Sequence, residues 1–199
     1  MSILLTSTGF SNPALADWAA REISTHGLKR AAIVVTAHRL KTERHYSQIA
    51  LQQMRELGCT EAFFFDYETD DSTLLDGADA LYVCGGNTFR LMAAMDKKKA
   101  RPWLDQLFSR NGLYIGESAG SAVMGSTIEH LATIGMDPDE HSWGNRAALN
   151  FISQPILPHA GPEWSPIMTK PHMAIRDHEG LVWNITTQSV EQRFPPPTA

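Results

Sequence analysis

The chain has few cysteines and no long apolar run. Its 199 residues include only Cys59 and Cys84, too few for a disulfide scaffold, which fits a reducing compartment. No stretch approaches the roughly 20 apolar residues of a membrane span. The first residues also lack the basic region and the apolar stretch of a signal peptide. We therefore expect a cytoplasmic protein that makes no contact with a membrane.

Basic charge is also scarce. The chain has 17 lysines and arginines against 22 aspartates and glutamates, a net charge of −5, so nothing predicts a nucleic-acid surface. No histidines and cysteines have the spacing of a zinc site. The first strand-to-helix turn lacks the glycine fingerprint of dinucleotide binding. We expect no nucleic-acid partner, no metal and no cofactor.

What the chain does have is a regular alternation of strand and helix patterns. Because βαβ units form parallel sheets covered on both faces, the predicted fold class is α/β with a mostly parallel sheet flanked by helices. Such sheets bind ligands at the carboxyl ends of their strands. Strands are expected over 3–8, 31–36, 62–65, 80–84 and 113–117, and helices over 13–26, 42–57, 72–76, 87–95 and 102–109.

The C-terminal third has a different pattern. Residues 173–176 and 181–187 are expected to form a β-hairpin that turns through 177–180. The tail from about residue 190, with its Phe-Pro-Pro-Pro run, is expected to be extended or disordered. No internal repeat or linker is present, so residues 1–199 are predicted to form one domain.

The most informative motif is Gly116-Glu117-Ser118-Ala119-Gly120, which follows an apolar run and precedes small residues. This pattern predicts a strand, a sharp turn and a helix with Ser118 at the apex, the context of a serine nucleophile. Gly116 and Gly120 would permit the turn, because side chains there would collide with the neighbouring strand and helix. The alternative is a tight glycine-rich packing turn without chemistry.

A serine nucleophile needs a base, and histidine suits that task near neutral pH. Of eight histidines, His159 is best placed, because it follows an apolar strand and a proline. The oxyanion of the intermediate needs N–H donors. The amide of Ala119 and the glycine turn at Gly85 and Gly86 could supply them. The turn could equally start a helix capped by Asn87 or the following threonine, and both roles are compatible.

Four segments, 83–89, 115–122, 149–151 and 157–159, resemble the dipeptidase E (alpha-aspartyl dipeptidase) family of serine peptidases, to which cyanophycinase is related. The resemblance runs from about residue 3 to 181. It implies a fold similar to class I glutamine amidotransferases and, as substrates, dipeptides with an N-terminal aspartate. It also implies Ser118 as nucleophile, His159 as general base, and Gly86 with Ala119 as oxyanion donors.

The acid of the triad stays open between two main candidates. Asp177 lies where the family carries an acidic residue near the histidine, and Asp137 lies where the family has a functionally important aspartate. Asp137 could also cap a helix, since Asp before Pro is a common start signal. Glu179 is a further possibility.

The chain departs from the family after His159, where aspartyl dipeptidases carry arginines that suit an acidic side chain. Residues 160–168 contain none. The substrate-binding candidates are therefore Lys170, Arg176 and Arg90, together with Gly85 and Asn87 of the glycine turn. We expect a small peptide as the partner of a monomer or homodimer. The alternatives are a hydrolase of another amide, an ester or a cyanophycin-like polymer, and a non-catalytic binding domain.

Overall fold

The computed structural model describes residues 2–139, 144–164 and 171–197. Its central sheet contains β1 Ser2–Thr6, β2 Arg30–Val34, β3 Glu61–Phe65, β4 Ala80–Val83, β5 Leu113–Glu117, β8 Gly180–Asn184 and β9 Ser189–Phe194. The strand order is β3-β2-β4-β5-β1-β8-β9. Strands β1 to β5 run parallel, whereas β8 is antiparallel to β1, and β9 to β8. This architecture confirms the predicted fold class.

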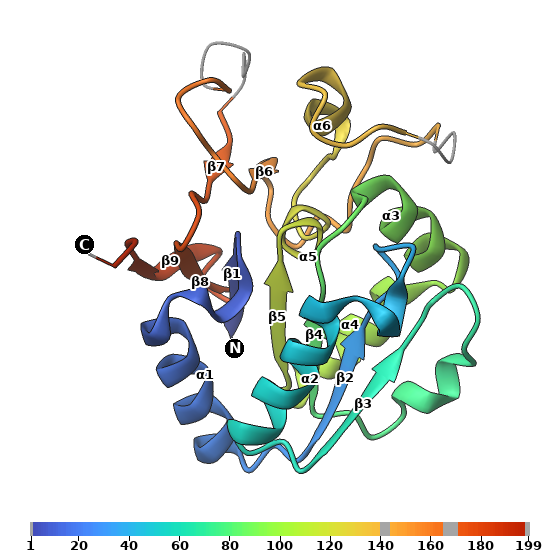
Figure 1. Cartoon of the computed structure of the whole chain (residues 1–199), viewed down its shortest axis with the longest axis vertical. Coiled ribbons are helices and arrows are strands. Elements are labelled where there is room, and N and C mark those ends of the chain that lie inside the picture. The colour runs from blue at the N-terminus through green and yellow to red at the C-terminus, as the bar shows by residue number, and fades with distance from the viewer. Residues whose placement is uncertain (1, 140–143, 165–170, 198–199) are drawn as a thin grey trace.

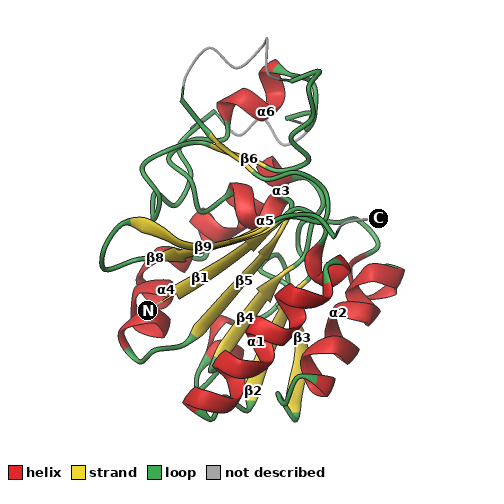
Figure 2. Cartoon of the chain, turned by 90° about the vertical axis from the view of Figure 1, so that its left-hand side faces the viewer, coloured by secondary structure: helices red, strands yellow, loops and turns green. Residues whose placement is uncertain are grey.

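Helices cover both faces of the sheet (Figure 1, Figure 2). One face packs against α1 Pro13–His26 and α2 His45–Glu56. The other packs against α3 Thr88–Lys97, α4 Ala100–Ser109 and α5 Ala119–Ala122. Three single turns of 3₁₀ helix lie in the connections, η1 Gly9–Ser11, η2 Lys41–Glu43 and η3 Ser72–Leu75. Both faces of the parallel strands are therefore buried, which is why those segments have continuous apolar runs.

A smaller layer lies beyond the carboxyl ends of the parallel strands (Figure 1). It contains α6 Glu129–Thr133 and the two short strands β6 Ile156–Leu157 and β7 Met173–Ala174, which pair in parallel. This layer brings the C-terminal part of the chain over the sheet edge where the candidate residues were expected. No helix in the described ranges is long and apolar enough to cross a membrane.

Helix α1 shows why some elements could be predicted to the residue. The Asn12 side chain accepts a hydrogen bond from the Ala14 amide, and Pro13 occupies the first helical position, where a missing N–H costs nothing. Gly27 ends the helix in the left-handed conformation with φ 65°. All the signals are local, and the predicted range of 13–26 is the observed one.

The hairpin predicted from residues 173–176 and 181–187 is wrong. Met173–Ala174 pairs with β6, and β8 pairs with β1 and β9, so residues 177–180 lead the chain back to the central sheet instead of forming a hairpin turn. The C-terminal hairpin consists of β8 and β9, whose connection is fixed by the Asn184 side chain accepting the Thr186 and Thr187 amides. Residues 190–194, expected in an extended or disordered tail, are the paired edge strand β9.

Candidate active site

Ser118 occupies the single residue between β5 and α5. Its backbone has φ 51° and ψ −108°, a conformation that L-residues rarely adopt and that costs free energy. A Cβ on Gly116 would lie 2.6 Å from the Gly120 carbonyl oxygen, and a Cβ on Gly120 would overlap the Val83 carbonyl of strand β4. Both glycines are therefore needed for the sharp turn, as the motif predicts.

Three candidate residues form one chain of hydrogen bonds. His159 Nε2 lies 2.9 Å from Ser118 Oγ, and His159 Nδ1 lies 2.6 Å from Asp177 Oδ1. Partial burial works against ionisation of Asp177, but the contacts from His159 outweigh it and hold the pKa of Asp177 below its usual value. His159 and Asp177, which follow Ser118 by 41 and 59 residues in the sequence, thus meet it at one point.

Ser7 supports this chain of hydrogen bonds, and sequence reasoning missed it. Its hydroxyl donates to Asp177 Oδ1 at 3.0 Å and accepts the His159 amide at 2.7 Å. His159 has φ 53°, and this backbone bond helps to hold that uncommon conformation. The expected first strand included Ser7, but β1 ends at Thr6, which leaves Ser7 at the carboxyl end of a strand, where site residues gather.

Asp137, the second candidate acid, has other partners. Its Oδ2 accepts the Thr88 amide at 3.1 Å and the Thr88 hydroxyl at 2.5 Å. Burial raises the pKa of Asp137, and the bonds from Thr88 offset part of that effect. Asp137 therefore contacts the beginning of α3 and does not lie in the hydrogen-bonded chain of Ser118, His159 and Asp177.

The amides of the glycine turn between β4 and α3 differ in their acceptors. Gly85 donates its N–H to the Glu117 carboxylate, Asn87 to the Ala37 carbonyl at 2.8 Å, and Thr88 to Asp137. Gly86 is the residue of this turn whose amide has no acceptor within the described ranges. Gly86 has φ 148°, and a Cβ there would overlap the Ala37 backbone. Asn87 caps α3 by accepting the Arg90 amide at 2.9 Å, so the predicted helix start is confirmed.

Glu117, directly before Ser118, was missed by the sequence analysis. Its Oε2 accepts the Tyr82 hydroxyl at 3.0 Å. Burial raises the pKa of Glu117, and the Tyr82 hydroxyl and the nearby Arg44 charge offset part of that rise. No local pattern distinguishes this half-buried glutamate from any other residue at the variable position of the motif.

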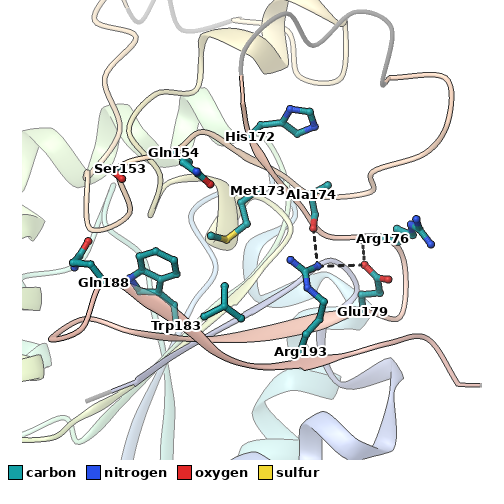
Figure 3. Close-up of a pocket in the computed structure, with 11 residues that line it drawn as sticks. Ser153, Gln154, His172, Met173, Ala174, Arg176, Glu179, Trp183, Gln188 and Arg193 are labelled. Carbon is teal, nitrogen blue, oxygen red and sulfur yellow. Dashed lines mark hydrogen bonds and ion pairs between the residues drawn. The ribbon is translucent and has the colours of Figure 1, made fainter.

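The three predicted cations differ in their surroundings. Arg90 is bound through two nitrogens to Glu68, at 2.7 and 2.6 Å. Arg176 is exposed, and in Figure 3 its guanidinium points away from the Arg193 and Glu179 pair. Lys170 lies outside the described residues. Arg176 is therefore the candidate cation that lies exposed near Asp177.

Two cavities lie beside the carboxyl-end layer. One of about 420 Å³ is lined by Leu157, Ala160, Gly161, Pro162, His172, Ala174 and Arg176. A larger one of about 630 Å³ lies between β7 and the β8–β9 hairpin (Figure 3), and its lining includes none of Ser118, His159 and Asp177. The smaller cavity is the better candidate for a substrate subsite, because its lining includes Leu157 and Ala160, on either side of His159 in the sequence, although none of the three residues themselves. Trp164 packs half-buried against the core.

Arg193 of β9 fixes the segment that carries Asp177. Its guanidinium donates to the Ala174 carbonyl at 3.1 Å and lies 4.0 Å from Glu179 Oε2 (Figure 3). Glu179 in turn accepts the Arg176 amide at 2.9 Å. Glu179, the least favoured acid candidate, therefore holds the turn around Asp177 and makes no contact with His159 that the structure shows.

A cluster of charges joins the loop before α2 to α3. Glu68 lies 2.6 Å from Lys41 Nζ and 2.6 Å from Arg90 Nη2, and Lys41 also contacts Asp66. The hydrogen bond from Arg90 is the largest contribution to a pKa of Glu68 of about 2, against an ordinary 4.5.

Among the described residues, no group of three or more His, Cys, Asp and Glu side chains is arranged to hold a metal ion.

Glu68→Gln is expected to lower the free energy of unfolding by about 1–2 kcal/mol at pH 7, because it removes a partly buried charged acceptor. A lowered carboxyl pKa stabilises the fold above the unfolded value and loses that effect as pH falls through the folded value. The difference from wild type should therefore shrink between pH 4.5 and about 2. Urea unfolding at pH 7, 5 and 3 measures it. Exposed Glu43→Gln is the control, and an equal loss there would contradict the assignment.

Comparison with known proteins points to one family. Residues 3–185 match the model described as Peptidase family S51. An uncharacterized peptidase from Listeria monocytogenes is 33% identical over 88 residues, which are 44% of this chain and 43% of that protein. One from Pasteurella multocida is 24% identical over 137 residues, which are 66% of this chain and 65% of that protein. The matches therefore span less than two thirds of these relatives.

Solved structures agree on the fold. The crystal structure of a candidate peptidase E protein from Listeria monocytogenes superposes with a TM-score of 0.72 at 22% identity, covering 97% of this chain and 96% of the other. A peptidase from an acI-B1 actinobacterium gives a TM-score of 0.63 at 22% identity, covering 91% and 82%. These similarities confirm the α/β architecture over nearly the whole chain.

Proposed function

Because the chain belongs to peptidase family S51, we propose that it is a serine peptidase acting on small peptides, with dipeptides that carry an N-terminal aspartate as the leading substrates. The observation that carries this proposal is the chain of hydrogen bonds from Ser118 through His159 to Asp177. This chain of hydrogen bonds lies at the carboxyl ends of parallel strands. Beside it is the Gly86 amide, which has no acceptor within the described ranges.

In the proposed reaction, Asp177 accepts a hydrogen bond from His159 Nδ1–H and so keeps Nε2 unprotonated. His159 Nε2 takes the proton of Ser118 as Oγ attacks the peptide carbonyl. The tetrahedral oxyanion is bound by the amides of Gly86 and Ala119. The Ala119 amide is the first of helix α5, where an N–H has no acceptor within the helix.

The intermediate collapses when His159 returns the proton to the leaving amine, which leaves an acyl group on Ser118. A water molecule, deprotonated by the same histidine, then attacks the acyl group, releases the acid and regenerates the serine.

Asp137 is assigned a positioning role, because it holds Thr88 and with it the glycine turn.

For the substrate side chain, Arg176 is the proposed cation, since it is exposed, directly precedes Asp177 and lines the smaller cavity. A guanidinium binds a carboxylate through two parallel hydrogen bonds, a geometry that an ammonium group does not offer. Lys170 and Arg90 remain weaker candidates, and Gly85 and Asn87 would contribute to substrate binding through the turn they form.

Hydrolysis of a dipeptide panel tests the activity. We expect cleavage of Asp-X at least tenfold faster than of Asn-X and Ala-X, because loss of one charged hydrogen-bonding partner costs about 1.5–3 kcal/mol. Glu-X keeps the charge on a longer side chain and tests selection by length. Arg176→Gln should raise KM for Asp-X about tenfold or more and leave Ala-X unchanged. Arg110→Gln is the control, because Arg110 donates to the Ala78 carbonyl at the opposite, amino-terminal end of the parallel strands.

The panel also separates the alternatives. Equal cleavage of all four dipeptides would indicate a pocket without charge selection. Cleavage of an ester or of an aspartyl polymer, and of no dipeptide, would indicate the second enzymatic function. Absence of turnover on every substrate would favour a binding domain and contradict the proposal.

A further inference from the structure

Arg44 contacts the glycine turn, and the reaction described above gives this residue no role. It lies at the N-terminal boundary of α2, half-buried, and its Nη1 donates to the Gly85 carbonyl at 2.5 Å. The guanidinium also lies 5.4 Å from the centre of the Tyr46 ring. Arg44 was not among the residues that the sequence marked for chemistry.

The Gly85 carbonyl and the Gly86 amide belong to the same peptide unit. That unit is planar, and in its trans form the C=O and N–H bonds point in opposite directions. A guanidinium bound to the oxygen therefore fixes the direction of the N–H. It also polarises the unit, because hydrogen bonds in series strengthen one another and a charged donor strengthens them most.

Gly85 is held on its other side as well. Its own amide donates to the Glu117 carboxylate, and a Cβ on Gly85 would lie 3.0 Å from Ser118 Cβ. The turn therefore lies directly against Ser118, the candidate nucleophile. The Gly85 carbonyl contacts Arg44, and the Gly85 amide contacts Glu117. Among the amides of this turn, the one left for a ligand is that of Gly86.

We propose that Arg44 is a positioning residue of the oxyanion hole, which orients and polarises the Gly86 N–H through the Gly85 carbonyl. This inference rests on the proposed function and adds to it a residue that touches neither substrate nor triad. Because the oxyanion exists only after attack by Ser118, Arg44 acts on the transition state and not on substrate binding.

Arg44→Met is the variant that tests the proposal, since it keeps most of the side-chain volume and removes the donor. Removal of one oxyanion donor lowers kcat by about 10²–10³-fold, and loss of its orientation should lower kcat by about 10–100-fold with KM within about twofold. The inhibition constant of a peptide aldehyde, which forms an oxyanion on Ser118, should rise by a similar factor. Arg44→Lys, which retains a charged donor, should recover part of kcat.

Arg55→Met is the matched control. Arg55 lies on the same helix and also donates to a backbone carbonyl, that of Ala62 at 3.1 Å, but away from the turn. Thermal unfolding of both variants shows whether the fold is retained. If Arg44→Met matches Arg55→Met in kcat and aldehyde affinity while the wild type is active, or raises only KM, the inference is wrong. A wild type that neither hydrolyses peptides nor binds the aldehyde overturns the proposed function instead.

Discussion

Ser118→Ala is expected to reduce hydrolysis of the best dipeptide by at least ~10⁴-fold, because no other group in the proposed mechanism can form the acyl intermediate. The backbone at this position has φ 51° and ψ −108°, which alanine tolerates no better than serine. The free energy of unfolding should therefore change by less than about 1 kcal/mol. Steady-state hydrolysis and urea unfolding of the same preparation check both statements.

Ser118→Gly is the informative companion variant. Glycine relieves the strain of about 1–3 kcal/mol that this conformation imposes but loses about 0.5–1 kcal/mol of conformational freedom on folding. We expect it to be equally inactive and about 1 kcal/mol more stable than Ser118→Ala. Retained turnover in either variant would remove Ser118 from the role of nucleophile. A glycine variant less stable than the alanine variant would contradict the strain argument.

Asp177→Asn is expected to lower kcat by about 10³–10⁴-fold, because an amide no longer selects the histidine tautomer or stabilises its charged form. The Asp177 side chain is 57% exposed, so water can replace part of its effect, and the lower end of that range is the more realistic. Asp137→Asn keeps an oxygen that can accept the Thr88 amide, and we expect it to lower kcat less than about tenfold.

Rates of the two asparagine variants on one substrate, measured across pH, decide between the acids. Ser7→Ala adds a third arm, since it removes the hydroxyl that joins Asp177 to the His159 backbone, and a loss intermediate between the two is expected. A larger loss in Asp137→Asn than in Asp177→Asn would assign the acid to Asp137. It would also mean that the 137–138 loop moves toward His159 when substrate binds.

The parts of the molecule that the sequence predicts well are those with local causes. Helix α1 has its cap and its proline at its start and its terminal glycine at its end, and the strand before Ser118 starts directly after Gly112. The motif around Ser118 likewise contains the glycines that make its turn possible. For such segments, neighbouring residues specify the backbone before any tertiary contact forms.

The parts that the sequence does not predict depend on partners far away in the chain. Ser7, Arg44 and Glu117 have roles only because the fold brings residues 177, 85 and 82 to them. Strand β9 is almost entirely exposed and has no apolar alternation, so its pairing follows from the neighbouring β8 and not from its own residues. The misplaced hairpin has the same origin, since pairing choice is a tertiary property.

The segment around Asp177 is held by both edges of the fold: Ser7, after the first strand, donates to Asp177, and Arg193 of the last strand donates to the Ala174 carbonyl. Asn12 adds to this junction, because its amide donates to the carbonyls of both His178 and Pro195. On a ribosome, a chain that has already buried the core of its parallel strands still lacks a fixed acid beside His159. The proposed peptidase activity should therefore be the last property that the folding chain acquires, once the antiparallel edge with residues up to Pro195 has been added.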